Sequence, residues 1–237
     1  MNETASLALA TAAFVGTHFL LSHPLRAGLV ARLGQGAFTG LYSLVAFATL
    51  GWMIVAFRSI DHSVPLWIAP LWWWPVASVL MLLALILLAG SFASNPALPH
   101  PGAKARAERP AAGVFAITRH PMNWSFMLWA LVHISLSGSP RNLIVAGGIL
   151  LLALFGSIGQ DAKKRKLYPE TWGGWEARTA FVPFGAMAAG KLPWRSALPG
   201  WVPLIAGLLL WLAVTWYHAP LVSPIGGLGR GFGGALV

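Results

Sequence analysis

The sequence predicts an all-α fold, a polytopic transmembrane helical bundle of about six spans. Of the 237 residues, 57% are hydrophobic and only 9% are charged, whereas a soluble domain has roughly a quarter of its residues charged. The apolar residues gather into charge-free stretches close to the ~20 residues that a helix needs to cross ~30 Å of hydrocarbon. The basic residues gather in alternate connections between these stretches, as they do in membrane proteins.

Six apolar stretches follow one another, and we expect each to form one span. They run approximately from Thr4 to Pro24, Phe38 to Phe57, Leu71 to Ala93, Met122 to Gly138, Asn142 to Gln160 and Gly200 to His218. The residues before the first stretch include Glu3 and no Lys or Arg, unlike those of a signal peptide, so we expect this stretch to be retained. We therefore predict one transmembrane domain over residues 1–220 and a flexible, glycine-rich tail over residues 221–237.

The positions of the Lys and Arg residues predict the orientation. Thirteen of the 16 lie after the first, third and fifth stretches. The positive-inside rule then places these connections in the cytoplasm and both termini on the other side of a bacterial inner membrane. With a net charge of +10 on so apolar a chain, the expected partner is a bilayer with anionic headgroups and not nucleic acid. The chain has no cysteine, which excludes disulfides and thiolate metal sites.

Two connections are long. Residues 95–121 are rich in Pro, Ala and basic residues, and we expect a loop along the cytoplasmic face. Residues 161–199 begin with QDAKKRK, predicted to continue the fifth helix beyond the membrane. The following segment, YPETWGGWEARTAFVPF, mixes Trp and Phe with charges, as segments at the membrane interface do.

His18 and His133 lie inside apolar stretches, where an ionisable group is costly and usually faces the bundle interior with a partner. Neutral imidazole is a ligand for haem iron, so the two residues are candidates for one haem site. Their predicted heights in the membrane differ by ~9 Å, which helix tilt can absorb. The alternative for each is a hydrogen bond to a neighbouring helix.

His23 and His120 lie at the predicted cytoplasmic edge, each directly before a proline. Proline disfavours helix in the residue before it, so we expect His23 to end the first helix and Pro121 to begin the fourth. His120 and Arg119 at this helix start form a corner suited to a carboxylate or phosphate. The alternative is a turn that contacts lipid headgroups. His120 and His133 are ~20 Å apart along one helix, so they belong to separate sites.

The segments GTHFLLSHPLRAGLVARLGQGAFTGLYSLVAF and TRHPMNWSFMLWALVHISLSG resemble the NnrU family of bacterial membrane proteins, which has the plant and cyanobacterial 15-cis-zeta-carotene isomerases as relatives. The resemblance covers most of the first four stretches. It implies a link to denitrification and nitric oxide metabolism, with other denitrification membrane proteins as partners. From the isomerase branch it implies haem b on His18 and His133, isomerase-like chemistry and an apolar small molecule as substrate. The alternative cysteine ligand of that branch has no counterpart here.

A wider resemblance supplies an alternative. The RHP motif before a late span, with a basic stretch, aromatic residues and VPF after the next span, is similar to membrane methyltransferases that act on isoprenylcysteine or phospholipids. This similarity implies that His120 and Glu176 help to hold S-adenosylmethionine. Asn123 stands where those enzymes have Tyr, a departure from the motif.

Three classes of function follow from these observations. The first is a haem-binding membrane protein with isomerase-like or redox-sensing chemistry at His18 and His133. The second is a methyltransferase-like enzyme with its site around Arg119, His120 and Glu176. The third is a non-enzymatic accessory protein of a respiratory complex. The family-level expectation is an inner-membrane protein of the NnrU type.

Overall fold

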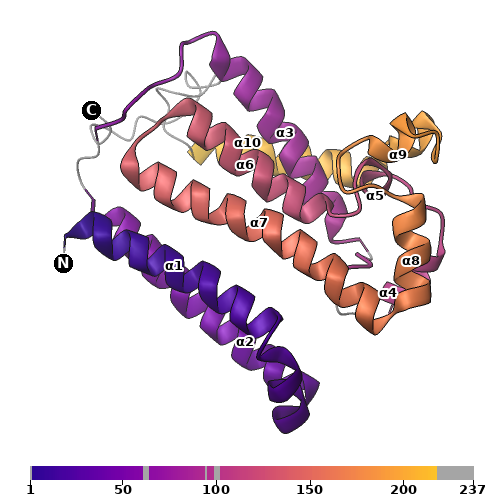
Figure 1. Cartoon of the computed structure of the whole chain (residues 1–237). Helices are drawn as coiled ribbons and strands as arrows, with labels where there is room; N and C mark the ends of the chain where they lie inside the picture. Colours follow the sequence, from indigo (N-terminus) through magenta and orange to yellow (C-terminus); the bar gives the residue numbers. More distant parts are fainter. Residues whose placement is uncertain (1, 61–63, 94, 99–101, 218–237) are drawn as a thin grey trace. The chain divides into compact units, whose positions relative to one another are not determined.

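The computed structural model describes residues 2–60, 64–93, 95–98 and 102–217 (Figure 1). Within these ranges the chain is helical, and its β-type pairing is one isolated bridge between Ile68 and Ser137. The helices are α1 (Glu3–Ser22), α2 (Arg26–Arg58), α3 (Trp73–Ser91), α4 (Ala103–Glu108), α5 (Val114–Ile117), α6 (Pro121–Leu136), α7 (Pro140–Leu167), α8 (Pro169–Arg178), α9 (Gly185–Ala188), the 3₁₀ helix η1 (Trp194–Ala197) and α10 (Trp201–Tyr217).

Each predicted apolar stretch coincides with a helix, so the all-α class is confirmed. Four helices, α1, α2, α3 and α7, are long and apolar enough to cross a membrane. Helices α6 and α10 have 16 and 17 residues. At 1.5 Å per residue they span only ~24–26 Å, so six spans and the orientation of the termini stay predictions. The predicted tail over residues 221–237 lies outside the described residues.

The chain divides into two compact units that interleave along the sequence. The first unit comprises residues 1–68 and 133–159, and the second comprises residues 69–132 and 160–237. Helices α6 and α7 each contribute to both units. Each unit is therefore made of two separate segments of the chain, within the region predicted as a single domain over residues 1–220.

In the first unit, α1 packs against both α2 and α7. Leu7, Ala10 and Phe14 of α1 are buried in a cluster with Met53 and Ala56 of α2. Apolar side chains of the first half of α7 complete this cluster: Ile144, Val145, Ile149 and Leu152. The core of the unit therefore lies along the inner face of α1.

Two glycines of α7 bring α1 close. A Cβ at Gly148 would collide with the Thr11 side chain, and a Cβ at Gly159 would lie 2.5 Å from Cε1 of His23. Small residues at such positions let membrane helices approach closely and gain van der Waals contact. Helix α1 ends at Ser22 with His23 as its C-cap, as the SHP motif predicted.

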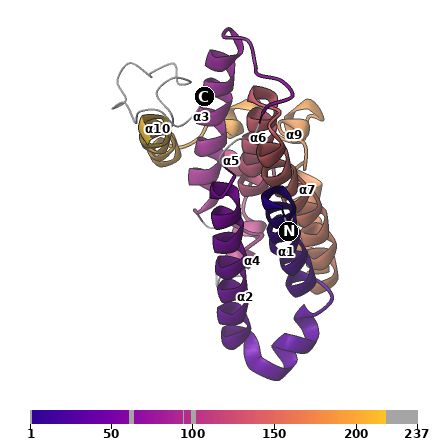
Figure 2. The same cartoon turned by 90° about the vertical axis from the view of Figure 1, so that its left-hand side faces the viewer.

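Helix α2 is interrupted near its start. Gly34 has φ 77° and ψ 162°, a backbone conformation outside the helical region that only glycine adopts without strain. The turns before Gly34 run at an angle to the rest of α2 (Figure 2). The helix therefore consists of a short first segment and a long straight segment.

Contacts of Trp67 with Ile134 and Gly138, here called the Trp67 closure, join the segment after α2 to the end of α6 and the connection that follows it. The Trp67 indole lies over Gly138, where a Cβ would meet its ring, and Nε1 of Trp67 donates to the Ile134 carbonyl at 3.0 Å. The Gly138 amide donates to the Trp67 carbonyl at 2.9 Å. This closure fixes the end of α6 that carries His133.

In the second unit, α3 and α10 pack side by side. A Cβ at Gly207 would meet the backbone of Ile86, and Nε1 of Trp211 donates to the Ser78 carbonyl at 3.1 Å. A second cluster joins Leu87 of α3 to the buried Phe115, Trp172 and Trp175.

The two long connections contain helices. Residues 95–121, predicted as a loop, form α4 and α5, and the predicted interfacial segment forms α8. Helix α7 continues to Leu167, so the QDAKKRK sequence extends it as predicted.

Candidate functional site

The site begins at the sharp entry into α6. Pro121 is the first residue of this helix, as predicted, and the residues before it are extended. The Arg119 amide donates to the Ala180 carbonyl at 2.9 Å, and the Thr118 hydroxyl donates to the Phe181 carbonyl at 2.7 Å. These bonds hold the strip before α6 against the strip after α8. The Arg119 and His120 side chains then meet the end of α7.

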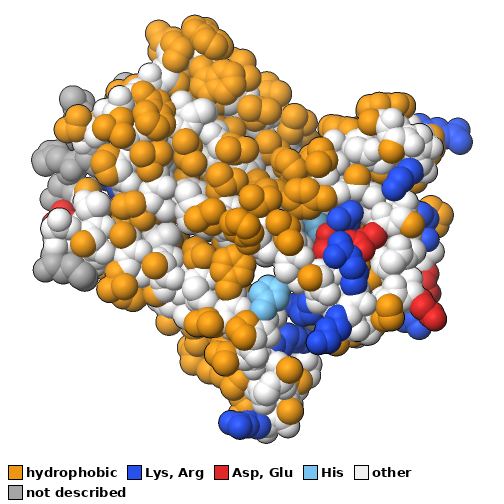
Figure 3. Space-filling model, in the orientation of Figure 1, with side chains coloured by type: hydrophobic (Ala, Val, Ile, Leu, Met, Phe, Trp, Pro, Cys, Tyr) orange, Lys and Arg blue, Asp and Glu red, His pale blue; other side chains and the backbone are white. Residues whose placement is uncertain are grey.

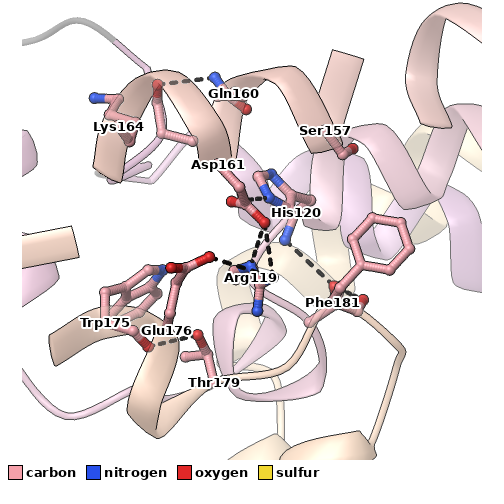
Figure 4. A network of polar contacts seen from close by, with 12 residues as sticks. Arg119, His120, Ser157, Gln160, Asp161, Lys164, Trp175, Glu176, Thr179 and Phe181 are labelled. Carbon is pink, nitrogen blue, oxygen red and sulfur yellow. Dashed lines mark hydrogen bonds and ion pairs between the residues drawn. The ribbon is translucent and has the colours of Figure 1, made fainter. Parts of the chain in front are cut away.

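His120 and Asp161 form a buried pair at the centre of the site (Figure 4). Nε2 of His120 lies 2.7 Å from Oδ1 of Asp161, and only 3% and 4% of the two residues are exposed. A carboxylate only accepts hydrogen bonds, so Nε2 of His120 carries the hydrogen. In the neutral ring this leaves Nδ1 as the nitrogen with a free lone pair.

Arg119 holds the other oxygen of Asp161. Its Nε and Nη2 lie 2.8 and 2.7 Å from Oδ2, and Nη2 lies 3.5 Å from Oε1 of Glu176. Arg165 grips Glu176 with two hydrogen bonds, of 2.7 and 2.8 Å. Two guanidinium groups thus face two carboxylates, and the network is neutral when His120 is neutral.

The network runs from the interior to the surface. Asp161 and Arg119 side chains are 5% and 13% exposed, whereas the Arg165 side chain is 57% exposed. Figure 3 shows acidic and basic side chains gathered in one patch beside hydrophobic helix faces. Electrostatic interactions are stronger at the buried inner end, where water screens them less.

Aromatic side chains surround the imidazole. The ring centroids of Trp172 and Phe181 lie 6.5 and 6.1 Å from that of His120. Trp124 packs against Phe181, with 5.8 Å between ring centroids, and donates from Nε1 to the Phe181 carbonyl at 2.8 Å. The His120–Asp161 pair therefore has an apolar wall.

The structure brings together Arg119, His120 and Glu176, three residues that the sequence singled out. It also shows that the expected anion corner is filled by carboxylates of the chain itself. Sequence reasoning missed Asp161 and Arg165. Asp161 did leave a signal, because it is one of only six acidic residues and ends an apolar run, where a carboxylate needs a partner.

His18 lies between α1 and α2 in the first unit. Its Nδ1 lies 2.7 Å from the Phe14 carbonyl, and its ring packs against the rings of Phe14 and Tyr42, with centroids 4.3 and 5.5 Å away. Because a carbonyl only accepts, Nδ1 carries the hydrogen and Nε2 keeps its lone pair. A backbone hydrogen bond of this kind also fixes metal-binding histidines.

The hydrogen bond and ring contacts of His18 are with Phe14 and Tyr42, so no direct contact of these kinds joins it to His133 among the described residues. Nδ2 of Asn142, at the start of α7, donates to the His133 carbonyl at 2.7 Å. Thr11 packs on Gly148 and His23 packs on Gly159, so α1 runs alongside α7 in the same direction. The backbone of His18 therefore lies about 12 residues further along α7 than Asn142, the residue that binds His133, which corresponds to ~18 Å. Among the described residues, no three His, Cys, Asp or Glu side chains are grouped to hold a metal ion.

The remaining candidate, His23, packs against α7 at Gly159, and its ring is stacked 6.3 Å from that of Phe19. It belongs to the α1–α7 contact in the first unit. His120 belongs to the network of the second unit.

Comparisons with known proteins identify one family and two similar plant proteins. The family described as NnrU protein matches residues 6–224 of the chain. The chain is also similar to the chloroplastic 15-cis-zeta-carotene isomerases of Arabidopsis thaliana and Zea mays. It is 30% identical to the first over 79 residues and 31% identical to the second over 83 residues. These matches cover 33% and 34% of this chain but only 22% and 23% of the two relatives. No solved structure matches the chain.

Proposed function

We propose that this chain, which belongs to the NnrU family, is a membrane enzyme that performs isomerase-like chemistry on a lipid-soluble substrate at the His120–Asp161 pair. The observation that carries the proposal is the 2.7 Å hydrogen bond between these two buried side chains. A buried, oriented imidazole beside a carboxylate is an arrangement that enzymes use to move protons.

The pair suits a reaction with no net change in oxidation state. Asp161 orients the ring of His120 through Nε2 and compensates the positive charge that the ring acquires when Nδ1 takes a proton. With both ring nitrogens protonated, His120 gives its Nδ1 proton to one carbon of the double bond, and the resulting delocalised carbocation rotates about the former double bond. Nδ1 then takes the proton back, so the substrate leaves with the same atoms and an isomerised double bond, and His120 returns to its starting state.

The surroundings of the pair favour an apolar substrate. Trp172 and Phe181 line the imidazole, and His120 directly precedes the apolar helix α6. A molecule dissolved in the bilayer could reach this position without crossing water. The similarity to isomerases named for 15-cis-zeta-carotene supports an extended polyene as the substrate class, although the matched segments span less than a quarter of those proteins.

The test is an isomerisation assay with the purified chain in lipid nanodiscs, with 15-cis-zeta-carotene as the substrate and chromatography of the isomers. We expect His120→Ala and Asp161→Asn to lower the rate by about 10²-fold or more, the range of general acid–base catalysis. Glu170→Gln is the matched control, because Glu170 is an exposed acidic residue on α8. A wild-type chain without activity, or a His120→Ala variant with full activity, would contradict the proposal.

We place this chemistry in denitrification or nitric oxide metabolism, in the bacterial inner membrane, as the NnrU resemblance suggests. The expected phenotype of a deletion strain is altered nitric oxide accumulation during growth on nitrate. Complementation with the wild-type chain and with His120→Ala connects this phenotype to the site. Unchanged nitric oxide in the deletion strain would argue against this setting.

A haem at His18 is the second candidate, and one observation favours it. The bond from Nδ1 to the Phe14 carbonyl leaves Nε2 of His18 as a potential axial ligand. His133 stays the predicted opposite ligand, and its backbone is offset from that of His18 by ~18 Å along α7. When bound, haem would supply electron chemistry that no side chain of the chain provides.

Optical spectra of the oxidised and reduced protein test the haem. A Soret band lost in His18→Ala and kept in His133→Ala would indicate the single ligand. Loss in both variants would support the paired ligands, and a colourless protein from haem-sufficient cells would exclude this candidate.

The methyltransferase-like alternative draws support from the contact between Arg119 and Glu176, which places Glu176 in the network of His120. Its test is a rise in the unfolding temperature with S-adenosylmethionine. An accessory role predicts neither ligand and instead the copurification of a respiratory membrane complex from native membranes.

A further inference from the structure

Helix α2 is longer than the thickness of the hydrocarbon core, so its first turns do not fit inside the membrane span. Its 33 residues would extend ~50 Å as one straight helix, far more than the ~30 Å of a hydrocarbon core. The break at Gly34 divides it. The part after the break, residues 35–58, is ~36 Å long and crosses the core by itself. The eight residues Arg26–Leu33 are therefore left outside it.

This short segment leaves large apolar side chains exposed. Leu25 and Leu33 are 48% and 46% exposed, and Gly28, Ala31 and Arg32 are also exposed. A helix of eight residues is not stable alone in water. Something other than the described residues of this unit is therefore expected to cover its apolar side.

The segment has two different faces. Leu25, Leu29 and Leu33 are spaced four residues apart, so they form one stripe along the helix. Ala27 and Ala31, both exposed, lie on the other side of the helix. The helix thus has one narrow apolar side, as have helices that lie flat on a membrane.

The two arginines differ in their contacts. Arg26 donates from Nη2 to Gln35 at 3.2 Å and lies 5.0 Å from the Phe38 ring centroid, so it reaches back across the break. Arg32 is exposed and makes no ion pair or hydrogen bond with any described residue. Its charge is available to an anion outside the chain.

We propose that residues 25–33 form an interfacial helix that lies on the anionic leaflet of the membrane. Leu25, Leu29 and Leu33 insert below the headgroups, and Arg32 contacts lipid phosphates. Gly34 provides the bend between the membrane surface and the span. The positive charge and the exposed leucines both match an anionic lipid surface, which identifies the occupant of this face.

The absence of native cysteine makes a direct test simple, because every introduced cysteine is unique. Leu29→Cys and Leu33→Cys probe the proposed lipid side, and Ala27→Cys and Ala31→Cys probe the opposite side. Each full-length variant is spin-labelled and reconstituted in vesicles of phosphatidylcholine with phosphatidylglycerol. Its accessibility to oxygen, which dissolves in lipid, and to a water-soluble nickel complex is then measured.

The expected result alternates with position. Labels at 29 and 33 are reached by oxygen more than by nickel, and labels at 27 and 31 show the reverse. Four water-exposed labels, or four lipid-exposed labels, would overturn the proposal. Spin–spin broadening between labels on different copies would overturn it too, because a second copy of the chain would then cover this face.

A second measurement tests the anionic headgroups and the bend. The label at Leu29 should lie deeper with phosphatidylglycerol than in phosphatidylcholine alone, and Arg32→Gln should remove that difference. Gly34→Ala should abolish the alternation, whereas Gly36→Ala, at a helical glycine with open space around it, should keep it. A depth independent of lipid charge, or an alternation that survives in Gly34→Ala, would contradict the proposal.

Discussion

His23 packs directly onto Gly159, so that a Cβ added at position 159 would lie 2.5 Å from Cε1 and 2.6 Å from Nε2 of the imidazole. The imidazole thus occupies space that any other residue at 159 would fill. This contact brings the end of α1 against the second half of α7.

Gly159→Ala should therefore destabilise the first unit. Forcing a methyl group into a packed contact typically costs ~1–3 kcal/mol. Gly156→Ala, at a glycine of the same helix with open space around it, is the control. Thermal unfolding in detergent measures both variants. The pair Gly159→Ala with His23→Ala should recover part of the loss, and a double variant no better than Gly159→Ala would argue against the packing explanation.

The contrast between predicted and observed helices has a physical cause. A span needs one continuous apolar run, so α1, α3 and α7 were visible in the sequence itself. Helices α4 and α8 are short and depend on tertiary contacts such as the burial of Trp172 and Trp175. No local pattern of apolar residues marks them.

The site divides in the same way. The RHP motif identified Arg119 and His120 because proline fixes the local backbone. Their partner Asp161 is 41 residues from His120, so only the fold shows that the two meet. The sequence does not predict the break at Gly34 either, because glycine is common in membrane helices and a sequence does not show its φ angle.

The inner ion pair should matter far more than the outer one. Asp161→Asn leaves the buried Arg119 guanidinium without its main counter-charge, and breaking a buried pair costs ~3–5 kcal/mol. Glu170→Gln removes a carboxylate from an exposed position and should change stability very little. Unfolding temperatures in detergent compare the two. Equal shifts would mean that the network does not hold α6 to α7.

Arg165 and Glu176 test the outer end of the network. The Arg165 side chain is 57% exposed, so solvent weakens its attraction for Glu176 despite two good hydrogen bonds. A double-mutant cycle with Arg165→Gln and Glu176→Gln should give a coupling of no more than about 1 kcal/mol, smaller at high salt. A larger, salt-independent coupling would show that the pair is shielded from water.

Two variants at the Trp67 closure should distinguish the contribution of its hydrogen bond to stability from the contribution of its packing. Trp67→Phe keeps a ring over Gly138 and loses the bond from Nε1 to the Ile134 carbonyl, at a cost of ~1 kcal/mol. Gly138→Ala places a methyl group against the indole and should cost more, ~1–3 kcal/mol. Hydrogen exchange of the amides around residue 138 would report the loosening. Faster exchange in Trp67→Phe than in Gly138→Ala would reverse this ranking.

The polar network also has an order in time, because its members are synthesised one after another. Arg119 and His120 emerge from the ribosome first, Asp161 follows, and Glu176 comes last with the indoles of α8. Until α8 has been made, Arg119 lacks its contact with Glu176, and Trp172 is not there to cover His120. A nascent chain stopped between α7 and α8 therefore carries an incompletely covered cation–carboxylate pair.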